Sequence, residues 1–422
     1  MQRYDTYKDS GVKWLGEIPS HWEMLALKHI LKSKKVLVGK HSSQYELLSL
    51  TLKGVVKRDM DNPEGKFPAS FDTYQAVEPN DFIFCNFDNE ETPRAVGLSP
   101  YKGMITGAYD VLSRNNPKLT DGFLIYYFLY IDDAKRFKPL YKGLRKTVPF
   151  DSFMSYKIPV PSIKEQNAIV SYLDTATEKI DAAIAQQQKM IDLLNERKQI
   201  IINRAVTKGL NPNAKMKDSG VEWIGEIPDG WFFLPGKSLY HENKVKNKNN
   251  EETNVLSLSY GKIIRKKELV EGLQPENYNS YQIVEPNYII IRCTDLQNDH
   301  TSLRIGLVKE RGIITGAYLG LIPHGNIIPS YLHLFLHVFD ITKEIYRYGS
   351  GTRQSLNWVD FKNLPILIPS PEEQESICKY VNDIEAKINK QVFIASNQIS
   401  LLQERKQIII NEVVTGKVKV TN

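Results

Sequence analysis

The chain contains two copies of one sequence pattern, and this internal repeat constrains its fold more than any other feature. The segment KDSGVKWLGEIPSHW at residues 8–22 returns as KDSGVEWIGEIPDGW at residues 217–231, with 11 of 15 positions identical. Later pairs keep nearly the same offset, among them GMITGAY and GIITGAY, IPVPSIKEQ and ILIPSPEEQ, and LLNERKQIIIN and LLQERKQIIIN. A period of about 208 residues is too long for a solenoid repeat. The sequence therefore indicates a duplicated pair of domains.

Each copy divides into a globular part and a long helix. Residues 23–160 and 232–367 mix short alternating apolar runs with Gly, Asn and Pro turn signals, which predicts mixed α/β domains. Residues 161–212 and 368–422 follow Pro-rich stretches and open with Ser followed by Glu and Gln, which is typical of a capped helix start. The repeated segment occupies residues 1–22 and, as a linker, residues 213–231.

Apolar or small residues recur at spacings of three and four along both long helices. The expected seams are Leu173, Ala176, Ile180, Ala183, Gln187, Met190, Leu194 and Ile201, and Val381, Ile384, Ile388, Val392, Ala395, Ile399, Leu402 and Ile409. A seam of about four heptads indicates a coiled coil. We expect the two helices to form an antiparallel pair, which would separate two similar domains and relate the copies by a pseudo-two-fold rotation. Glutamines on or beside the seam leave room for a partner on the same helices.

Composition narrows the class of protein. The 55 Lys and Arg residues against 49 Asp and Glu give a net charge of +6, which permits a nucleic-acid partner without requiring one. Three scattered cysteines argue against a disulfide framework or a four-ligand zinc site, and we expect them to be reduced and structural. No run approaches the roughly 18 to 20 apolar residues of a membrane span, and the N-terminus lacks the apolar core of a signal peptide. We therefore expect a cytoplasmic protein.

The repeated segments together resemble the specificity subunits of type I restriction-modification enzymes. The resemblance rests on the DSGVxWLGEIPxHW-like segment in both copies, the IPxPSxxEQ entry into each long helix and the LLxERKQIIIN element, and it covers nearly the whole chain. It implies a DNA-recognition subunit in which each globular domain is a target-recognition domain that reads one half of a bipartite, asymmetric DNA site.

The resemblance also implies how the rest of the chain is used. The helical regions would separate the two domains, set the spacing between the half-sites and carry two methyltransferase subunits, which restriction and translocase subunits then join. The N-terminal segment would lie beside the C-terminal helix. The chain itself would have no catalytic activity and bind no cofactor, with S-adenosylmethionine, ATP and Mg expected on the partner subunits.

Catalytic motifs do not stand out in the sequence. It lacks a Walker loop, a paired-proline adenine-gripping loop and a strand-borne carboxylate cluster of the nuclease kind. His333 and His337 have metal-ligand spacing but lie in the apolar run YLHLFLHVF, where a core or interface role is favoured. Two alternatives stay open: a scaffold that binds only protein, and the remnant of a methyltransferase-nuclease fusion. No metal site is expected.

DNA-contacting residues should be cations and amides in the polar, Gly-punctuated segments, where the copies diverge. The candidates are Lys57, Arg58, Arg94, Lys142, Arg145 and Lys146 in the first domain, and Arg265, Arg292, Gln297, Asn298, Arg304, Arg347, Arg353 and Gln354 in the second. The Gly-x-Arg pairs at 143–145 and 351–353 coincide under the repeat, and glycine allows close approach to a phosphate.

Residues shared by both copies favour the scaffold, because the two domains would read different sequences. Tyr109, Tyr318 and the tryptophans of the repeated segment are therefore expected to pack in the core. The ERKQ element is either an intramolecular helix contact or a docking site for a partner subunit. Its candidate partner-binding residues are Glu196, Arg197, Lys198, Glu404, Arg405 and Lys406.

Overall fold

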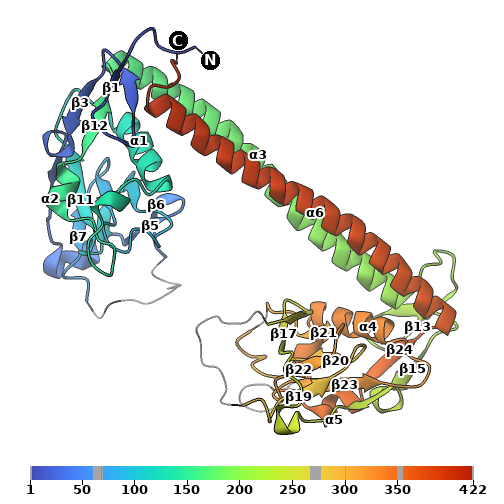
Figure 1. Ribbon diagram of the computed structural model, residues 1–422. Coiled ribbons are helices and arrows are strands. Elements are labelled where there is room, and N and C mark those ends of the chain that lie inside the picture. Colours follow the sequence, from blue (N-terminus) through green and yellow to red (C-terminus); the bar gives the residue numbers. More distant parts are fainter. Residues whose placement is uncertain are drawn as a thin grey trace. The chain divides into compact units, whose positions relative to one another are not determined.

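The computed structural model describes residues 2–59, 68, 70–266, 277–299, 301–348 and 355–420. The chain forms two compact units, Met1–Gln187 with Asn397–Asn422, and Gln188–Ser396. Each unit combines a mixed α/β domain with part of helix α3 (Ile163–Lys208) and part of helix α6 (Pro371–Val414) (Figure 1). The expected fold class, with two similar domains and two long helices, is confirmed.

The first unit contains a four-stranded antiparallel sheet in the order β4-β11-β8-β9, with the ribbons β10-β7, β5-β6, β12-β3 and β1-β2. Its helices are α1 (Asp121–Asp133) and α2 (Phe150–Met154). Short 3₁₀ turns lie at Leu27–His29, Gly39–Gln44 and Lys138–Leu140. The strands are β1 (Tyr7–Asp9), β2 (Glu17–Pro19), β3 (Glu23–Ala26), β4 (Leu31–Ser33), β5 (Leu48–Thr51), β6 (Gly54–Lys57), β7 (Gln75–Val77), β8 (Phe82–Phe84), β9 (Val96–Leu98), β10 (Gly103–Ile105), β11 (Asp110–Arg114) and β12 (Lys157–Val160).

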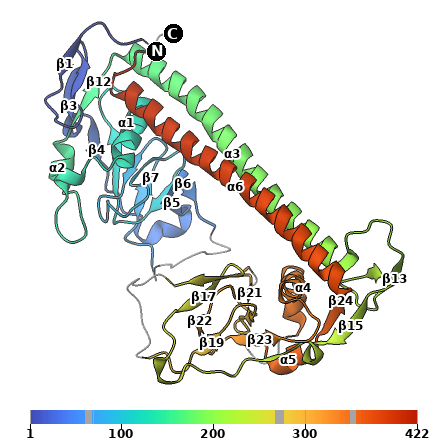
Figure 2. The same cartoon turned by 45° about the vertical axis from the view of Figure 1, so that its right-hand side comes forward.

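The second unit repeats this topology strand for strand: its sheet has the order β16-β23-β20-β21, with the ribbons β19-β22, β17-β18, β15-β24 and β13-β14. Strands β17, β19, β22 and β23 of this unit can be followed in Figure 2. Its helices are α4 (Pro329–Ile341) and α5 (Trp358–Lys362), with 3₁₀ turns at Gly236–Ser238, Lys248–Asn250 and Glu344–Arg347. The strands are β13 (Met216–Asp218), β14 (Glu226–Pro228), β15 (Phe232–Pro235), β16 (Tyr240–Glu242), β17 (Leu256–Ser259), β18 (Lys262–Arg265), β19 (Gln282–Val284), β20 (Ile289–Ile291), β21 (Ile305–Leu307), β22 (Gly312–Ile314), β23 (Leu319–Pro323) and β24 (Pro365–Ile368).

The main core of each domain lies between the sheet and its first helix. In the first unit Phe82 of β8 and Tyr127 of α1 are fully buried, and the same cluster takes in Trp22 and Leu173 of α3. Burial removes about 25 cal/mol of unfavourable hydration per Å² of apolar surface, so these large side chains dominate the stability of the domain. The tryptophan is a packing residue, as the repeat predicts.

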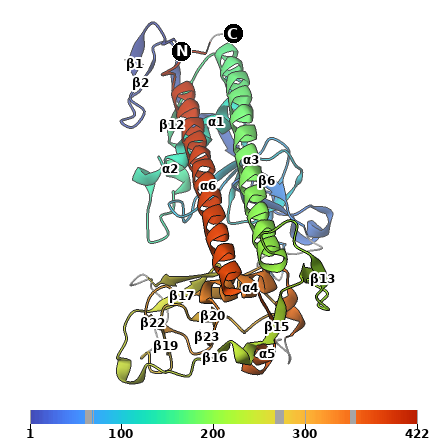
Figure 3. The ribbon, with the colours of Figure 1, turned by 90° about the vertical axis from the view of Figure 1, so that its right-hand side faces the viewer.

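Within each unit the segments of α3 and α6 lie side by side and run antiparallel (Figure 3). In the first unit the Lys406 ammonium of α6 pairs with the Asp181 carboxylate of α3 at 2.7 Å. The α6 seam agrees with the prediction, since Val381, Ile388 and Ala395 are buried. The α3 seam is wrong at Met190, which is 44% exposed. The heptad pattern predicts a step of three residues from Gln187 to Met190. In the structure the step is four residues, and Ile191, which is half-buried, takes the seam position instead.

The N-terminal segment lies against the end of α6, as the family resemblance implies. Gln2 forms an antiparallel bridge with Lys419, and the Tyr7 hydroxyl donates to the Gly416 carbonyl at 3.1 Å. Gly416 has φ +75, and a side chain there would collide with Pro19 and Trp22. The second unit packs its own copy of the segment, through Trp231, on the end of α3.

Candidate nucleic-acid interface

The β5-β6 and β17-β18 hairpins carry three of the candidate cations. Lys57 and Arg265 occupy equivalent positions at the ends of the returning strands, because they pair with Leu48 and Leu256. Both side chains are exposed, and Arg58 beside Lys57 is half-buried. Lys57 forms an ion pair with Glu46. The hairpins thus place basic groups at matched positions in both domains.

In the first unit, Lys142, Arg145 and Lys146 lie on one loop that is tied to the loop after β8. Arg145 pairs with Asp88 at 2.5 Å, and its carbonyl accepts from the Asp88 main-chain N–H at 2.7 Å. Glu90 forms ion pairs with Lys138 and Lys146, and the two ammonium groups lower the pKa of its carboxyl to about 2. These exposed pairs contribute little stability each, so a phosphate can compete for the same cations.

Gly143 in this loop adopts φ +70 with open space around its α-carbon. The glycine therefore serves the turn itself, a left-handed conformation that other residues adopt at a cost. Arg94, the remaining candidate of this domain, is half-buried beside Asp133, and its Nε atom is buried without a hydrogen-bond partner among the described residues.

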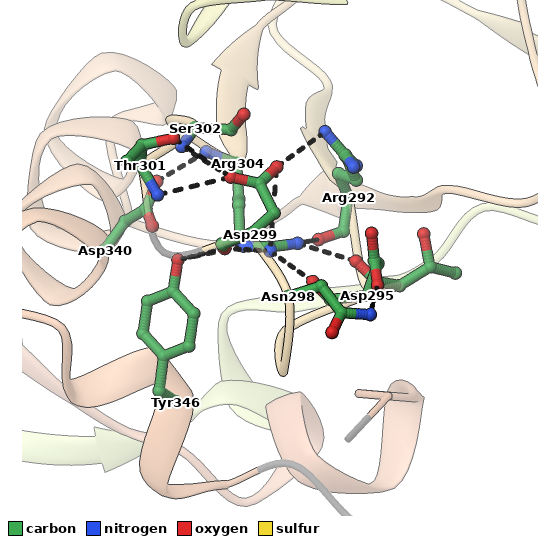
Figure 4. A network of polar contacts seen from close by, with 10 residues as sticks. Arg292, Asp295, Asn298, Asp299, Thr301, Ser302, Arg304, Asp340 and Tyr346 are labelled. Carbon is green, nitrogen blue, oxygen red and sulfur yellow. Dashed lines mark hydrogen bonds and ion pairs between the residues drawn. The ribbon is translucent and has the colours of Figure 1, made fainter. Parts of the chain in front are cut away.

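In the second unit, Arg292, Asn298 and Arg304 meet in a network of polar contacts within the loop after β20 (Figure 4). Arg292 pairs with Asp299 at 3.1 Å, and the Asn298 amide donates to Asp295 at 2.8 Å. Arg304 is 0% exposed and donates to main-chain carbonyls of the same loop. We therefore leave it out of the residues proposed to touch DNA, because its guanidinium has no face toward solvent.

The remaining candidates of the second domain lie at the surface or outside the described residues. Gln297 is exposed in the same loop as Asn298. Arg347 is exposed and pairs with Glu222 and Glu344, each at 3.3 Å. Arg353 and Gln354, with the second Gly-x-Arg pair, lie outside the described residues.

The candidate partner-binding residues are presented by the long helices. Glu196, Arg197, Glu404 and Arg405 are exposed, whereas Lys198 and Lys406 are half-buried. Lys406 makes the Asp181 ion pair described above. In the second unit the neighbouring Gln199 accepts through Oε1 from the His337 Nε2–H of α4 at 3.0 Å. The ERKQ element thus makes intramolecular contacts with some residues and exposes others.

Two shared motifs meet at the start of each long helix, a contact that sequence spacing did not reveal. The Trp22 indole N–H donates to Glu165 at 3.3 Å, and that of Trp231 donates to Glu373 at 3.2 Å. The same carboxylates accept from the main-chain N–H of the helix-capping serines, so each completes the capping box that the sequence predicts. The presence of both motifs in both copies of the repeat was the sequence signal that could have indicated this contact.

A buried glutamine follows each of these glutamates and joins the helix to the recognition domain. Gln166 accepts from the Thr120 N–H at 2.8 Å, just before α1, and Gln374 accepts from the Ile328 N–H at 2.9 Å, just before α4. Both glutamines are 1% exposed or less. The start of the first helix of each α/β domain is therefore attached to a long helix by the same polar contact in the two units.

Neither a metal site nor a membrane span is found in the part of the chain that the structure describes. Over those residues, no three His, Cys, Asp or Glu side chains gather as metal ligands would. None of the helices there combines the length and apolar character needed to cross a bilayer. His333 lies in the core of the second domain, and its ring stacks on that of His337 at 6.2 Å.

Comparisons with known proteins agree with this architecture. Residues 99–191 and 241–394, more than half of the chain, match the type I restriction modification DNA specificity domain. The chain belongs to this family. A putative type I restriction enzyme MjaX specificity subunit of Methanocaldococcus jannaschii is 23% identical over 98% of both chains. The type I restriction enzyme EcoBI specificity subunit of Escherichia coli is 25% identical over 62% of this chain and 58% of its own.

A solved structure shares the fold. It was described under the heading of complex assembly and conformational transition of the type I R-M system, and it superposes with a TM-score of 0.67. The match covers 95% of this chain and 99% of the other at 13% sequence identity. At that identity the likeness establishes the fold alone.

Proposed function

We propose that this chain is the DNA-recognition subunit of a type I restriction-modification complex, with each α/β domain reading one half of a bipartite, asymmetric site. The observation that supports the proposal is that the two α/β domains share the same framework but differ in the loops that it supports. In both units a buried carboxylate near the end of the first helix of the domain, Asp132 of α1 or Asp340 of α4, accepts the main-chain N–H of the residue just before β9 or β21. That residue is Ala95 in one unit and Arg304 in the other.

The loops on this common frame differ in length and in the way they are held. The loop after β8 is tied by exposed ion pairs such as that of Arg145 with Asp88, whereas the loop after β20 is organised around the buried Arg304. A repeated frame with different polar loops is what two readers of different sequences require. A scaffold that binds only protein has no need of basic groups at the matched positions of Lys57 and Arg265.

The partner subunits would carry the chemistry. We assign methyl transfer to two methyltransferase subunits with S-adenosylmethionine, and cleavage to restriction and translocase subunits with ATP and Mg. The docking site we propose for the methyltransferase is an exposed helix face that recurs under the repeat. It contains Leu193 and Ile200 on α3, which are 54% and 60% exposed, and Leu401 and Ile408 on α6, which are 63% and 46% exposed.

This docking face combines apolar side chains with a charge. Residues seven apart lie on the same side of a helix, and an arginine, Arg197 or Arg405, lies between the two apolar members of each pair. Large apolar side chains exposed at regular spacing mark an interaction surface. Arginine and aliphatic groups together suit the core of a protein interface.

Exchange of one recognition domain tests the proposal. Replacement of residues 232–367 with the corresponding domain of another family member should change one half-site and leave the other unchanged, because each domain reads its own half. Mapping of methylated adenines in the genome of a host that expresses the full complex measures the site. A change in both halves would contradict independent recognition.

A salt titration separates DNA recognition from the scaffold alternative. Phosphate contacts release counterions, so the affinity of the assembled complex for duplex DNA should fall steeply as salt rises. A scaffold that binds only protein would show no site-dependent retention of DNA at any salt concentration.

A further inference from the structure

The loop after β20 is built around a buried arginine that touches its main chain repeatedly. The Arg304 guanidinium donates to the carbonyls of Thr294 at 2.7 Å, Asp295 at 3.0 Å and Asp299 at 2.6 Å. A fully buried cation must be compensated, and here loop carbonyls supply most of the acceptors. These carbonyls come from both ends of residues 294–299, so one side chain fixes the path of the backbone over this stretch.

A second layer holds the arginine and the loop in place (Figure 4). The Tyr346 hydroxyl accepts from Arg304 Nε at 3.3 Å and donates to the Asp299 carbonyl at 2.9 Å. The Asp299 carboxylate accepts from the Ser302 N–H at 2.9 Å and pairs with Arg292 at 3.1 Å. The Ser302 N–H lowers the pKa of Asp299 well below its usual range, so this carboxylate stays charged at neutral pH. The base of the loop is therefore pre-organised.

On the outer side, the loop presents Asn298 with its amide orientation set. Its Nδ2 atom donates to Asp295 Oδ1 at 2.8 Å, and Asp295 itself turns the chain with φ +63. A carboxamide has two N–H groups and one carbonyl oxygen. Asp295 takes one N–H, and among the described residues no other hydrogen bond reaches the second N–H or the oxygen of this exposed side chain, so both can engage another molecule. That pair matches the N7 acceptor and N6 donor of adenine in the major groove.

We propose that Asn298 reads an adenine in the half-site of the second domain, and that Arg304 is the positioning residue that holds it there. The inference rests on the proposed function and extends it to one base and one supporting side chain. Ala95 stands at the place of Arg304 in the first domain, so the described residues there offer no equivalent of this arginine. The device therefore belongs to the second half-site alone.

The contact with adenine is tested with the full chain assembled with its methyltransferase subunits and a duplex that carries the mapped site. Asn298→Ala should lose about tenfold to hundredfold in discrimination at one A·T pair of the second half-site. Replacement of that adenine by 7-deazaadenine removes N7, and should weaken the wild-type complex but not the Asn298→Ala complex. Asn326→Ala, at an exposed asparagine of the same domain, is the matched control and should behave as wild type.

The positioning role is tested with Tyr346→Phe, which keeps the ring but removes the hydroxyl between Arg304 and Asp299, and with Arg304→Lys. Either variant should lose discrimination at the same base pair, while the salt dependence of binding stays unchanged because no phosphate contact is removed. The double variant Tyr346→Phe, Asn298→Ala should lose no more than Asn298→Ala alone, since the positioning acts through Asn298.

Two failures can be told apart. A folded Tyr346→Phe complex that keeps full discrimination, or an Asn298→Ala complex that still responds to 7-deazaadenine, would overturn the inference. If Arg304→Lys does not fold, Tyr346→Phe decides. A wild-type complex that shows no preference for any second half-site would instead overturn the proposed function.

Discussion

At the scale of single residues, α1 and α4 show how equivalent positions diverge in the two domains. His333 and His337 of α4 stand where α1 has Ile125 and Leu129, as the matched helix starts and the shared Asp132 and Asp340 require. Burial lowers the pKa of His333 to about 3 and that of His337 to about 4. Both rings are therefore neutral in the folded domain, in agreement with the core role expected from the sequence.

The two histidines should make the second domain acid-sensitive. The unfolded chain binds protons near pH 6.5, whereas the folded rings bind them only near pH 3 to 4, so stability falls as pH decreases through this window. Each buried ring should therefore lower the free energy of unfolding at pH 5 by on the order of 2 kcal/mol relative to pH 7.5. His333→Ile with His337→Leu should therefore stabilise the chain more at pH 5 than at pH 7.5, as measured by urea unfolding.

The comparison is made at equal pH because Asp340 titrates in the opposite sense. Burial raises its pKa to about 6, so its contribution to stability decreases as pH rises from about 4 to about 6. Asn326→Ala, at an exposed asparagine of the same domain, is the control and should leave the pH dependence unchanged, because neither side chain titrates. An identical pH dependence in the double variant and the wild type would contradict the assignment.

At the scale of elements, each long helix has one face that packs within the chain and another face that is exposed although it carries apolar residues. Val381 and Ile388 of α6 are buried, whereas Leu401 and Ile408 remain exposed although they keep heptad spacing. A helix that served only to pack its partner would place polar residues at these positions. The exposed apolar side chains therefore support the proposed methyltransferase docking face.

Charge substitutions on this face should weaken docking without unfolding the chain. Leu401→Asp with Leu193→Asp should reduce binding of the methyltransferase subunits at least tenfold, because a carboxylate would be desolvated in the interface. Affinity is measured by titration of the purified subunits with the variant chain. Gln403→Asp with Asn195→Asp, at exposed polar positions of the same helices, is the control. Unchanged binding by the leucine variants would place the docking site elsewhere.

At the scale of the whole molecule, we propose that α3 and α6 set the gap between the two half-sites. Seven residues rotate a helix by nearly two full turns and add about 10 Å, so removal of one heptad keeps the faces in register. Asp181 and Lys406 are partners in the first unit. Under the proposal this antiparallel register continues along the helices, and it then matches residues 184–190 of α3 with residues 397–403 of α6.

Deletion of both segments should shorten the gap by about three base pairs and leave each half-site sequence unchanged. The deletion removes Leu401, but Ile394 then stands seven residues before Ile408, so the docking face keeps an apolar side chain there. Mapping of methylated adenines reads both quantities in one experiment. Deletion from α3 alone is the control, and it should abolish methylation because the seams no longer match. A constant gap in the double deletion would show that the helices do not set it.

The sequence by itself determined the duplication, the division of each copy into an α/β domain and a long helix, and the capped helix starts. These features follow from repeat identity and local periodicity, which depend on residues close together in the chain. The capping serines, for example, lie three residues from the glutamates that complete the box. The predicted seam was wrong at Met190 because Met190 and Ile191 are both apolar, so the sequence does not distinguish a step of three residues from a step of four.

Only the tertiary structure decided what each polar residue of the candidate interface does. Arg304 and Arg265 are equally basic in the sequence, yet the fold buries the first among loop carbonyls and exposes the second. The contacts of Trp22 with Glu165 and of Trp231 with Glu373 join residues more than 140 positions apart. Burial and hydrogen bonding depend on residues that are distant in the sequence, and composition and local spacing do not indicate which of these residues come into contact.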